Sequence, residues 1–194
     1  DGRTRGAGAV IGLRTTRYPV SGARAVMERT PHVTLFDCDA WLLEQGLEQK
    51  PAAWFDVAER QEQLEAAKAA DAVRLDHADD DAAVGGGRMG TVGAVALDAR
   101  GGLAAATSTG GMTNKMAGRV GDSPVIGAGT HACAACAVSC TGKGEAFLRH
   151  AVAASIRDVV HKLRTAWAAQ QAAAQAARSS HHRSRAASAT SIDS

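Results

Sequence analysis

The strongest constraint on the fold of this chain is an abrupt change of character at Gly90 and Thr91. Residues 76–90 contain the runs Asp79-Asp80-Asp81 and Gly85-Gly86-Gly87, which have neither hydrophobic periodicity nor apolar surface. This composition predicts a solvated, flexible linker from about residue 75, and it favours that interpretation over a cation site at the acidic run. From Thr91 onward, small apolar residues dominate and predict a strand.

The linker is followed by a predicted β-hairpin. Residues 91–98 form the first strand, Arg100-Gly101-Gly102 the turn, and residues 103–109 the returning strand. Residues 127–140 predict further strand, and residues 141–144 a tight turn into a helix. That helix begins near Glu145, because apolar residues recur at three- and four-residue steps: Leu148, Val152, Ile156, Val159, Leu163 and Trp167. The Ala/Gln-rich continuation ends near residue 176, and residues 177–194 lack the apolar surface to order and are predicted to be a disordered tail.

The region before the linker is predicted to mix one strand with three helices. The small apolar residues 6–13 indicate a closely packed strand. Helices are predicted from Pro19 to Glu28, from about Asp39 to Gly46, and from Ala52 to about Val73.

Composition excludes several classes of protein. The chain has 22 Lys and Arg against 20 Asp and Glu, and aromatic residues make up 4%, so neither a basic surface nor base-stacking platforms for nucleic acid are expected. No run of about 18 apolar residues predicts a membrane span, and the N-terminus does not resemble a signal peptide. We therefore expect a cytoplasmic protein.

Three of the four cysteines lie close together with a histidine, as His131-x-Cys133-x-x-Cys136-x-x-x-Cys140. A structural zinc site usually separates two ligand pairs by a loop, which this cluster does not. The flanking Ala and Val residues favour a buried strand with thiols as small apolar fillers, so no metal site is predicted.

The linker boundary also suggests chemistry. Cutting the Gly90–Thr91 bond would leave Thr91 with a free α-amine beside its own hydroxyl. An α-amine has a pKa of about 7.7–8.0, so it can act as general base for that hydroxyl without a histidine. On this pattern alone, an ordinary strand start is the favoured interpretation.

Five sequence blocks, in order, add to this reading: GTVGAVALD (90–98), AATSTGGMTNK (105–115), GRVGDSP (118–124), GAG (127–129) and SCTGKGE (139–145). They resemble the plant-type L-asparaginase/isoaspartyl peptidase family, and GAGAV (6–10) and PHV (31–33) resemble its α-subunit, so the resemblance covers about residues 1–160. It implies an α+β fold, the four-layer αββα sandwich of N-terminal nucleophile hydrolases. Strands at both ends of that sandwich have no counterpart here, so it is incomplete.

The resemblance also implies roles for individual residues. Thr91 is expected to be the nucleophile and Thr109 to hold it in position. Arg119 would bind a substrate carboxylate and Asp122 a substrate ammonium, rather than forming only a surface ion pair with each other. Thr141 and Gly142 would form the oxyanion hole, and the Gly144 carbonyl would assist ammonium binding. The full set of expected substrate-binding residues is Arg119, Val120, Gly121, Asp122, Thr141, Gly142, Lys143 and Gly144.

The resemblance further implies hydrolysis of L-asparagine and β-aspartyl dipeptides to release aspartate. Self-cleavage between Gly90 and Thr91 would give an α-fragment, residues 1–90, and a β-fragment, residues 91–194, with its nucleophile and helix in residues 91–176; two such pairs would form a heterotetramer. No cofactor is expected, and the family's sodium-binding loop has no counterpart in this chain. The alternative is a truncated, degenerate homologue that keeps the site motif without catalysis.

Overall fold

The computed structural model describes the backbone of residues 1–73 and 90–190 and the side chains of these residues up to 175. Apart from Gly90, the predicted linker therefore lies outside the described residues. The chain divides into two compact units, Asp1–Arg157 and Asp158–Ser194. The first mixes helices with strands, which confirms the α+β class.

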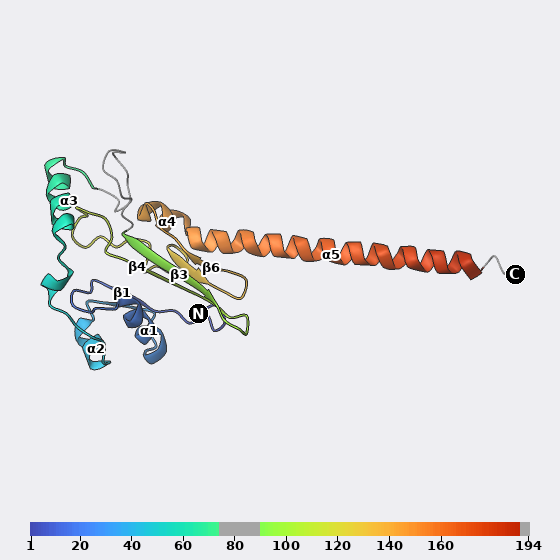
Figure 1. Cartoon of the computed structure of the whole chain (residues 1–194), viewed down its shortest axis with the longest axis horizontal. Helices are drawn as coiled ribbons and strands as arrows, with labels where there is room; N and C mark the ends of the chain where they lie inside the picture. The colour runs from blue at the N-terminus through green and yellow to red at the C-terminus, as the bar shows by residue number, and fades with distance from the viewer. Residues whose placement is uncertain (74–89, 191–194) are drawn as a thin grey trace. The chain divides into compact units, whose positions relative to one another are not determined.

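The N-terminal part of the first unit is a small parallel strand pair covered by helices (Figure 1). Strand β1 (Ala9–Ile11) pairs with β2 (Thr34–Phe36), and helix α1 (Pro19–Arg29) connects them. Pro19 suits the first turn of α1, where its missing N–H would have no helical partner. Helix α2 (Asp39–Glu44) follows β2. The core between these elements consists of buried Ala25, Cys38 and Leu42, surrounded by Val10, Leu13, Leu35, Trp41 and Leu47.

The prediction of one continuous helix over 52–73 is wrong, because two separate helices lie in this region. A short 3-10 helix (Ala52–Phe55) and helix α3 (Ala58–Ala69) occupy this region. They are separated because Asp56 and Val57 both have extended backbone angles, which no α-helix accommodates.

The predicted hairpin after Thr91 is confirmed. Strand β3 (Thr91–Leu97) pairs antiparallel with β4 (Leu103–Thr109), in a register that joins Thr91 to Thr109 and Leu97 to Leu103. Both faces of β3 retain exposed apolar side chains: Val92 is 64% exposed, Val95 56% and Leu97 69%. Such exposure is unusual for a strand rich in valine and leucine.

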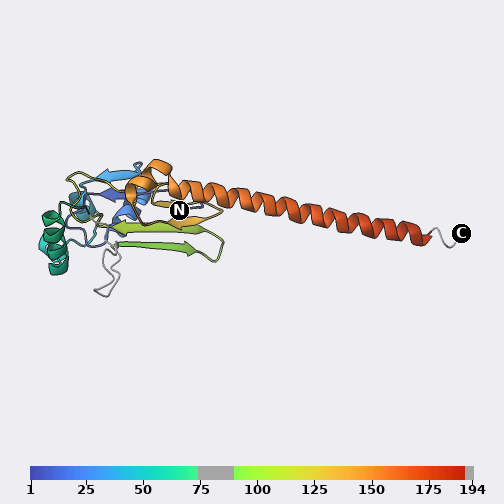
Figure 2. The ribbon, with the colours of Figure 1, turned by 90° about the horizontal axis from the view of Figure 1, so that it is seen from above.

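The further strand predicted over 127–140 is present as a second hairpin. Strand β5 (Thr130–Ala132) pairs antiparallel with β6 (Ala137–Ser139), and this hairpin lies against the β3–β4 hairpin (Figure 2). Close approach depends on small residues: a Cβ added to Gly93 would meet Ser139 Cβ at 2.8 Å and would also collide with Ser139 Oγ. The Thr107 and Ser139 hydroxyls, 2.7 Å apart, hydrogen bond across the contact.

The helix predicted from Glu145 is broken at Ala151. Helix α4 (Gly144–His150) ends there, Ala151 adopts a left-handed conformation with φ 44°, and α5 (Val152–Thr190) begins. The break gives the first amides of α5 partners outside the helix: Ala153 N–H donates to Ala128 O at 3.1 Å and Ala154 N–H to Gly127 O at 2.8 Å. An unbroken helix would use those amides internally, so the break anchors the loop before β5.

Taken by itself, the second unit is helical as far as Thr190. The tail is predicted to be disordered from residue 177, but α5 extends to Thr190, because residues 152–190 contain no Gly or Pro and many good helix formers. On α5 the predicted apolar stripe is largely exposed, with Leu163 at 65% and Trp167 at 63%. None of the helices within the described residues combines the length and the apolarity needed to cross a membrane.

Candidate active site

The two threonines predicted to be central to the chemistry are in direct contact. Thr91 is the first residue of β3 and Thr109 the last of β4, so the antiparallel register places them opposite each other at one end of the hairpin. Thr91 Oγ1 donates to Thr109 Oγ1 at 3.1 Å, and Thr109 Oγ1 also accepts the N–H of Gly111 at 3.0 Å. The Thr109 hydroxyl is thus held by the backbone after β4 and positions that of Thr91.

The guanidinium of Arg119 is half-buried and paired. Its side chain is only 16% exposed, and its Nε donates to Glu145 Oε1 at 2.9 Å. Glycines make room for it, because a Cβ at Gly121 would lie 3.0 Å from its Nη1 and a Cβ at Gly144 2.8 Å from its Nη2. This pair lowers the pKa of Glu145, chiefly through the hydrogen bond from Arg119. With its Nε occupied, Arg119 still has terminal N–H donors for a ligand carboxylate.

Asp122 is a buried carboxyl group, 7% exposed. Burial raises its pKa, against the lowering effects of its own backbone amide and the nearby Arg119 charge, while Glu145 adds to the rise. Within the described residues its Oδ2 has no hydrogen-bond partner. A buried carboxylate oxygen without a donor is unfavourable, so this atom is suited to accept from a cationic ligand. An ion pair of Arg119 and Asp122 on the surface is the wrong description, because Asp122 is buried and Arg119 pairs with Glu145.

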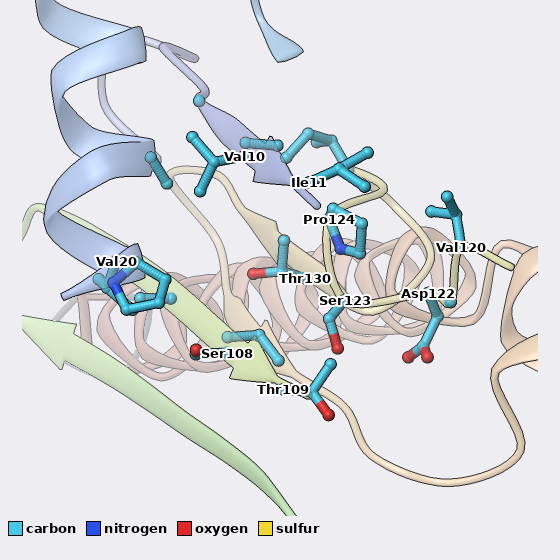
Figure 3. A pocket seen from close by; sticks show the side chains of 18 of the residues that line it. Val10, Ile11, Val20, Ser108, Thr109, Val120, Asp122, Ser123, Pro124 and Thr130 are labelled. Atoms are coloured by element: carbon cyan, nitrogen blue, oxygen red, sulfur yellow. The ribbon is translucent and has the colours of Figure 1, made fainter. Parts of the chain in front are cut away.

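These groups share one cavity of about 990 Å³. Besides α1 and β1, its walls include Thr91, Thr109, Arg119, Val120, Gly121, Asp122 and Gly142. In Figure 3 the oxygen atoms of Thr109, Ser123 and Asp122 lie at one end of this cavity, away from Val10 and Ile11. The cavity therefore combines hydroxyl, carboxylate and guanidinium groups at a polar end with an apolar wall, as small-molecule sites commonly do.

Only part of the turn before α4, residues 141–144, lines this cavity. Gly142 lines the cavity, whereas Thr141, Lys143 and Gly144 are not among its lining residues. Gly142 has φ 147°, a conformation that favours glycine, and a Cβ there would meet the Phe147 ring at 2.7 Å. Thr141 and Lys143 are exposed. Gly144 is buried, and a Cβ there would lie 2.8 Å from Asp122 Oδ1, so its backbone adjoins the carboxyl group.

Sequence reasoning missed two polar residues of this site. Glu145 ends the SCTGKGE block and has no expected role, although it pairs with Arg119. Ser123 is 7% exposed and lines the cavity beside Asp122. Each is adjacent to a residue with an expected role, and that adjacency was the only available signal. No group of three or more His, Cys, Asp or Glu side chains in residues 1–73 and 90–175 is arranged to hold a metal ion.

Comparison with known proteins places the chain in one family. A family model described as asparaginase matches residues 1–193, beyond the expected limit near residue 160. The chain is 52% identical over 155 residues to the isoaspartyl peptidase of Salmonella typhimurium, covering 77% of this chain and 48% of that protein. It is 51% identical over 155 residues to the isoaspartyl peptidase of Escherichia coli, covering 77% and 47%.

A further relative is the isoaspartyl peptidase/L-asparaginase of Rattus norvegicus, which is 43% identical over 152 residues and is matched over 77% of this chain and 44% of its own length. The chain thus spans about half the length of the curated relatives it matches. A match over nearly all of its residues and several relatives above 40% identity show that the chain belongs to the asparaginase family.

Proposed function

We propose that this chain carries the nucleophile and part of the substrate site of a self-cleaving hydrolase of L-asparagine and β-aspartyl dipeptides. The observation that carries the proposal is the 3.1 Å contact of the Thr91 and Thr109 hydroxyls at the edge of the cavity that contains Arg119 and Asp122. In the uncut chain the nitrogen of Thr91 is an amide and cannot take up a proton. After cleavage of the Gly90–Thr91 bond, it is an amine that serves as general base for the adjacent hydroxyl.

In the proposed reaction Thr91 Oγ1 attacks the side-chain carbonyl carbon of the substrate. The tetrahedral intermediate collapses with release of ammonia from asparagine, or of an amino acid from a β-aspartyl dipeptide. The acyl group left on Thr91 is then hydrolysed by water, which releases aspartate and restores the hydroxyl. We assign the oxyanion contacts to the Thr141 hydroxyl and the Gly142 amide.

Substrate selection follows from the charges of half-buried Arg119 and buried Asp122. The remaining N–H groups of Arg119 suit an α-carboxylate, and Oδ2 of Asp122 suits an α-ammonium. The Gly144 carbonyl would add an acceptor beside Asp122. A pocket that binds both groups of a free aspartyl unit explains selection for asparagine and β-aspartyl dipeptides over an aspartyl residue within a chain, whose α-groups are in peptide bonds.

The finer architecture and the assembly are part of this proposal. We infer a four-layer αββα sandwich, completed by residues equivalent to the other half of the relatives' length, and a heterotetramer of two cleaved pairs. The exposed apolar residues Val92, Val95 and Leu97 of β3 support this, since a completed sandwich would cover them. A cytoplasmic location, and the absence of any cofactor, remain predictions.

Mass spectrometry of the purified chain during prolonged incubation tests the proposal. We expect two fragments divided before Thr91, absent in Thr91→Ala and retained at a reduced rate in Thr91→Ser, which keeps a hydroxyl. Ammonia release from asparagine should appear only in preparations that contain the fragments. A split at another bond, or unchanged turnover in Thr91→Ala, would refute it.

The alternative is a non-catalytic homologue, and the exposed β3 strand favours it if nothing completes the sheet. That alternative predicts a persistent intact chain without ammonia release, while asparagine or aspartate still binds. A cooperative thermal transition separates both outcomes from a chain that does not fold.

A further inference from the structure

Two cysteines face each other where the β5–β6 hairpin turns. The register that pairs Ala132 with Ala137 continues by one step, because Cys133 N–H donates to Cys136 O at 2.9 Å. The two Sγ atoms are 3.8 Å apart. Opposed residues of antiparallel strands have Cα atoms about 4.5–5.5 Å apart, within the range of about 4.4–6.8 Å that disulfides bridge. Side-chain rotation at this position can therefore bring the sulfurs into bonding distance.

The surroundings of Cys133 favour its thiolate. Burial on its own would raise the pKa of Cys133, but hydrogen bonds outweigh it: the backbone amide of Ala135, which donates to Sγ at 3.4 Å, the backbone of Cys136 and the Cys136 thiol. The positive charge of Arg157 acts in the same direction, and the pKa of Cys133 is lowered. The thiolate is the reactive form of cysteine, so this sulfur is the nucleophile of the pair.

The other two cysteines, Cys38 and Cys140, lie outside the hairpin turn and have raised pKa values. Cys38 is buried in the core beside Leu42, and burial raises its pKa. Burial also raises the pKa of Cys140, with a further contribution from the Asp122 charge. All four cysteines lie among the described residues, and none is in a disulfide. Cys38 and Cys140 therefore serve as internal controls for any chemistry assigned to the hairpin.

We propose that Cys133 and Cys136 form a peroxide-reactive dithiol that closes to an intramolecular disulfide at the turn of the hairpin. The Cys133 thiolate attacks one oxygen of hydrogen peroxide, which breaks the O–O bond and yields a sulfenic acid on Cys133 and hydroxide, which takes up one proton to become water. The Cys136 thiol then displaces the sulfenic oxygen as a second water. Two thiols are oxidised to one disulfide, and the two electrons reduce one peroxide.

The site lies outside the proposed catalytic cavity, because neither cysteine lines it. It nevertheless belongs to the segment that leads into the turn before α4: β6 runs from Ala137 to Ser139, whose hydroxyl meets Thr107 at 2.7 Å. A disulfide between Cys133 and Cys136 would fix the end of this hairpin covalently without consuming a residue assigned to catalysis.

The test uses the reduced full chain and hydrogen peroxide at low molar excess, followed by alkylation and intact mass. We expect two of the four thiols to escape alkylation and the chain to lose two hydrogens, with peptide mapping placing the link between Cys133 and Cys136. In Cys136→Ser, a dimedone adduct should accumulate on Cys133. The matched control Cys140→Ser should close its disulfide at the parental rate.

Three results would overturn the proposal: all four thiols alkylated after peroxide treatment, a link that includes Cys38 or Cys140, or loss of closure in Cys140→Ser. Repeating the oxidation in guanidinium, which unfolds the chain, tests whether closure depends on the folded hairpin or only on the short spacing of the two cysteines in the sequence. Preferential closure of the pair should weaken there, and an unchanged preference would show that the hairpin plays no part.

Discussion

The packing of the two hairpins gives the sharpest test of the fold, through Gly93→Ala. Glycine at this position allows Ser139 of β6 to lie directly over β3, and an added Cβ would meet Ser139 Cβ at 2.8 Å and collide with Oγ. Both hairpins are regular, so neither strand can move away without disturbing the Thr107–Ser139 hydrogen bond. We therefore expect the substitution to lower the free energy of unfolding.

The magnitude combines two opposing terms. Overpacking a close contact costs about 1–3 kcal/mol. Replacing a mid-strand glycine by alanine recovers about 0.5–1 kcal/mol of backbone entropy. Subtracting the second term from the first leaves a net loss of up to about 2.5 kcal/mol, and about 1 kcal/mol at the midpoints. A loss of about 1 kcal/mol lowers Tm by about 2–4 °C for a chain of this size.

Thermal unfolding followed by circular dichroism measures this, and a second background makes it specific. In Ser139→Gly the obstructing side chain is gone, and the next atom near a Cβ at position 93 is Ala106 O at 3.8 Å, an ordinary contact. There Gly93→Ala should raise Tm by about 1–4 °C, from the entropy term alone. Gly110→Ala is the matched control, because nothing lies within 4 Å of a Cβ there. A Gly93→Ala chain that melts at or above the parental temperature would refute the packing argument.

Three further predictions concern the cavity. Glu145→Gln weakens the pairing that orients Arg119, so the KM for asparagine should rise about fivefold with little change in kcat. A partly exposed pair contributes about 1 kcal/mol, which corresponds to that factor. An effect on kcat alone would contradict this. Burial raises the pKa of Asp122, so on acidification this carboxylate should become protonated, and stop binding the substrate ammonium, at a higher pH than an ordinary aspartate would. The plot of KM against pH should show this acidic rise in the parental chain and not in Asp122→Asn. An unchanged plot in that variant would exclude Asp122 as the titrating group. Thr109→Val removes the hydroxyl that contacts Thr91 and should slow self-cleavage about two- to tenfold by mass spectrometry, with Thr109→Ser near the parental rate; equal rates in both would show that the contact plays no role.

The sequence predicted local structure well where hydrophobic pattern and turn residues agreed. The β3–β4 hairpin and the start of α1 at Pro19 are examples, since each depends on residues adjacent in the chain. The break at Ala151 could not be predicted in this way. It depends on carbonyls of Gly127 and Ala128, far back in the sequence, accepting the first amides of α5.

The same distinction applies to the candidate site. The motifs predicted Arg119 and Asp122 as ligand-binding groups, and the structure shows both lining one cavity. Their partners were not predictable: the hydrogen bond to Glu145 and the unsatisfied Oδ2 of Asp122 depend on how α4 packs beside the loop before β5. Exposure of both faces of β3 likewise depends on what lies beside the strand, which an alternating pattern does not specify.

The register of the β3–β4 hairpin has a consequence for the proposed cut before Thr91. Every residue from Thr91 to Leu97 has a partner on β4, and the first of these pairs is Thr91 with Thr109. A newly created chain end usually frays, yet here the whole strand behind it stays laddered to its neighbour. In the proposed cleavage the new amine would therefore form at the end of a strand that is already paired, and substrate would meet a terminus already in its working position.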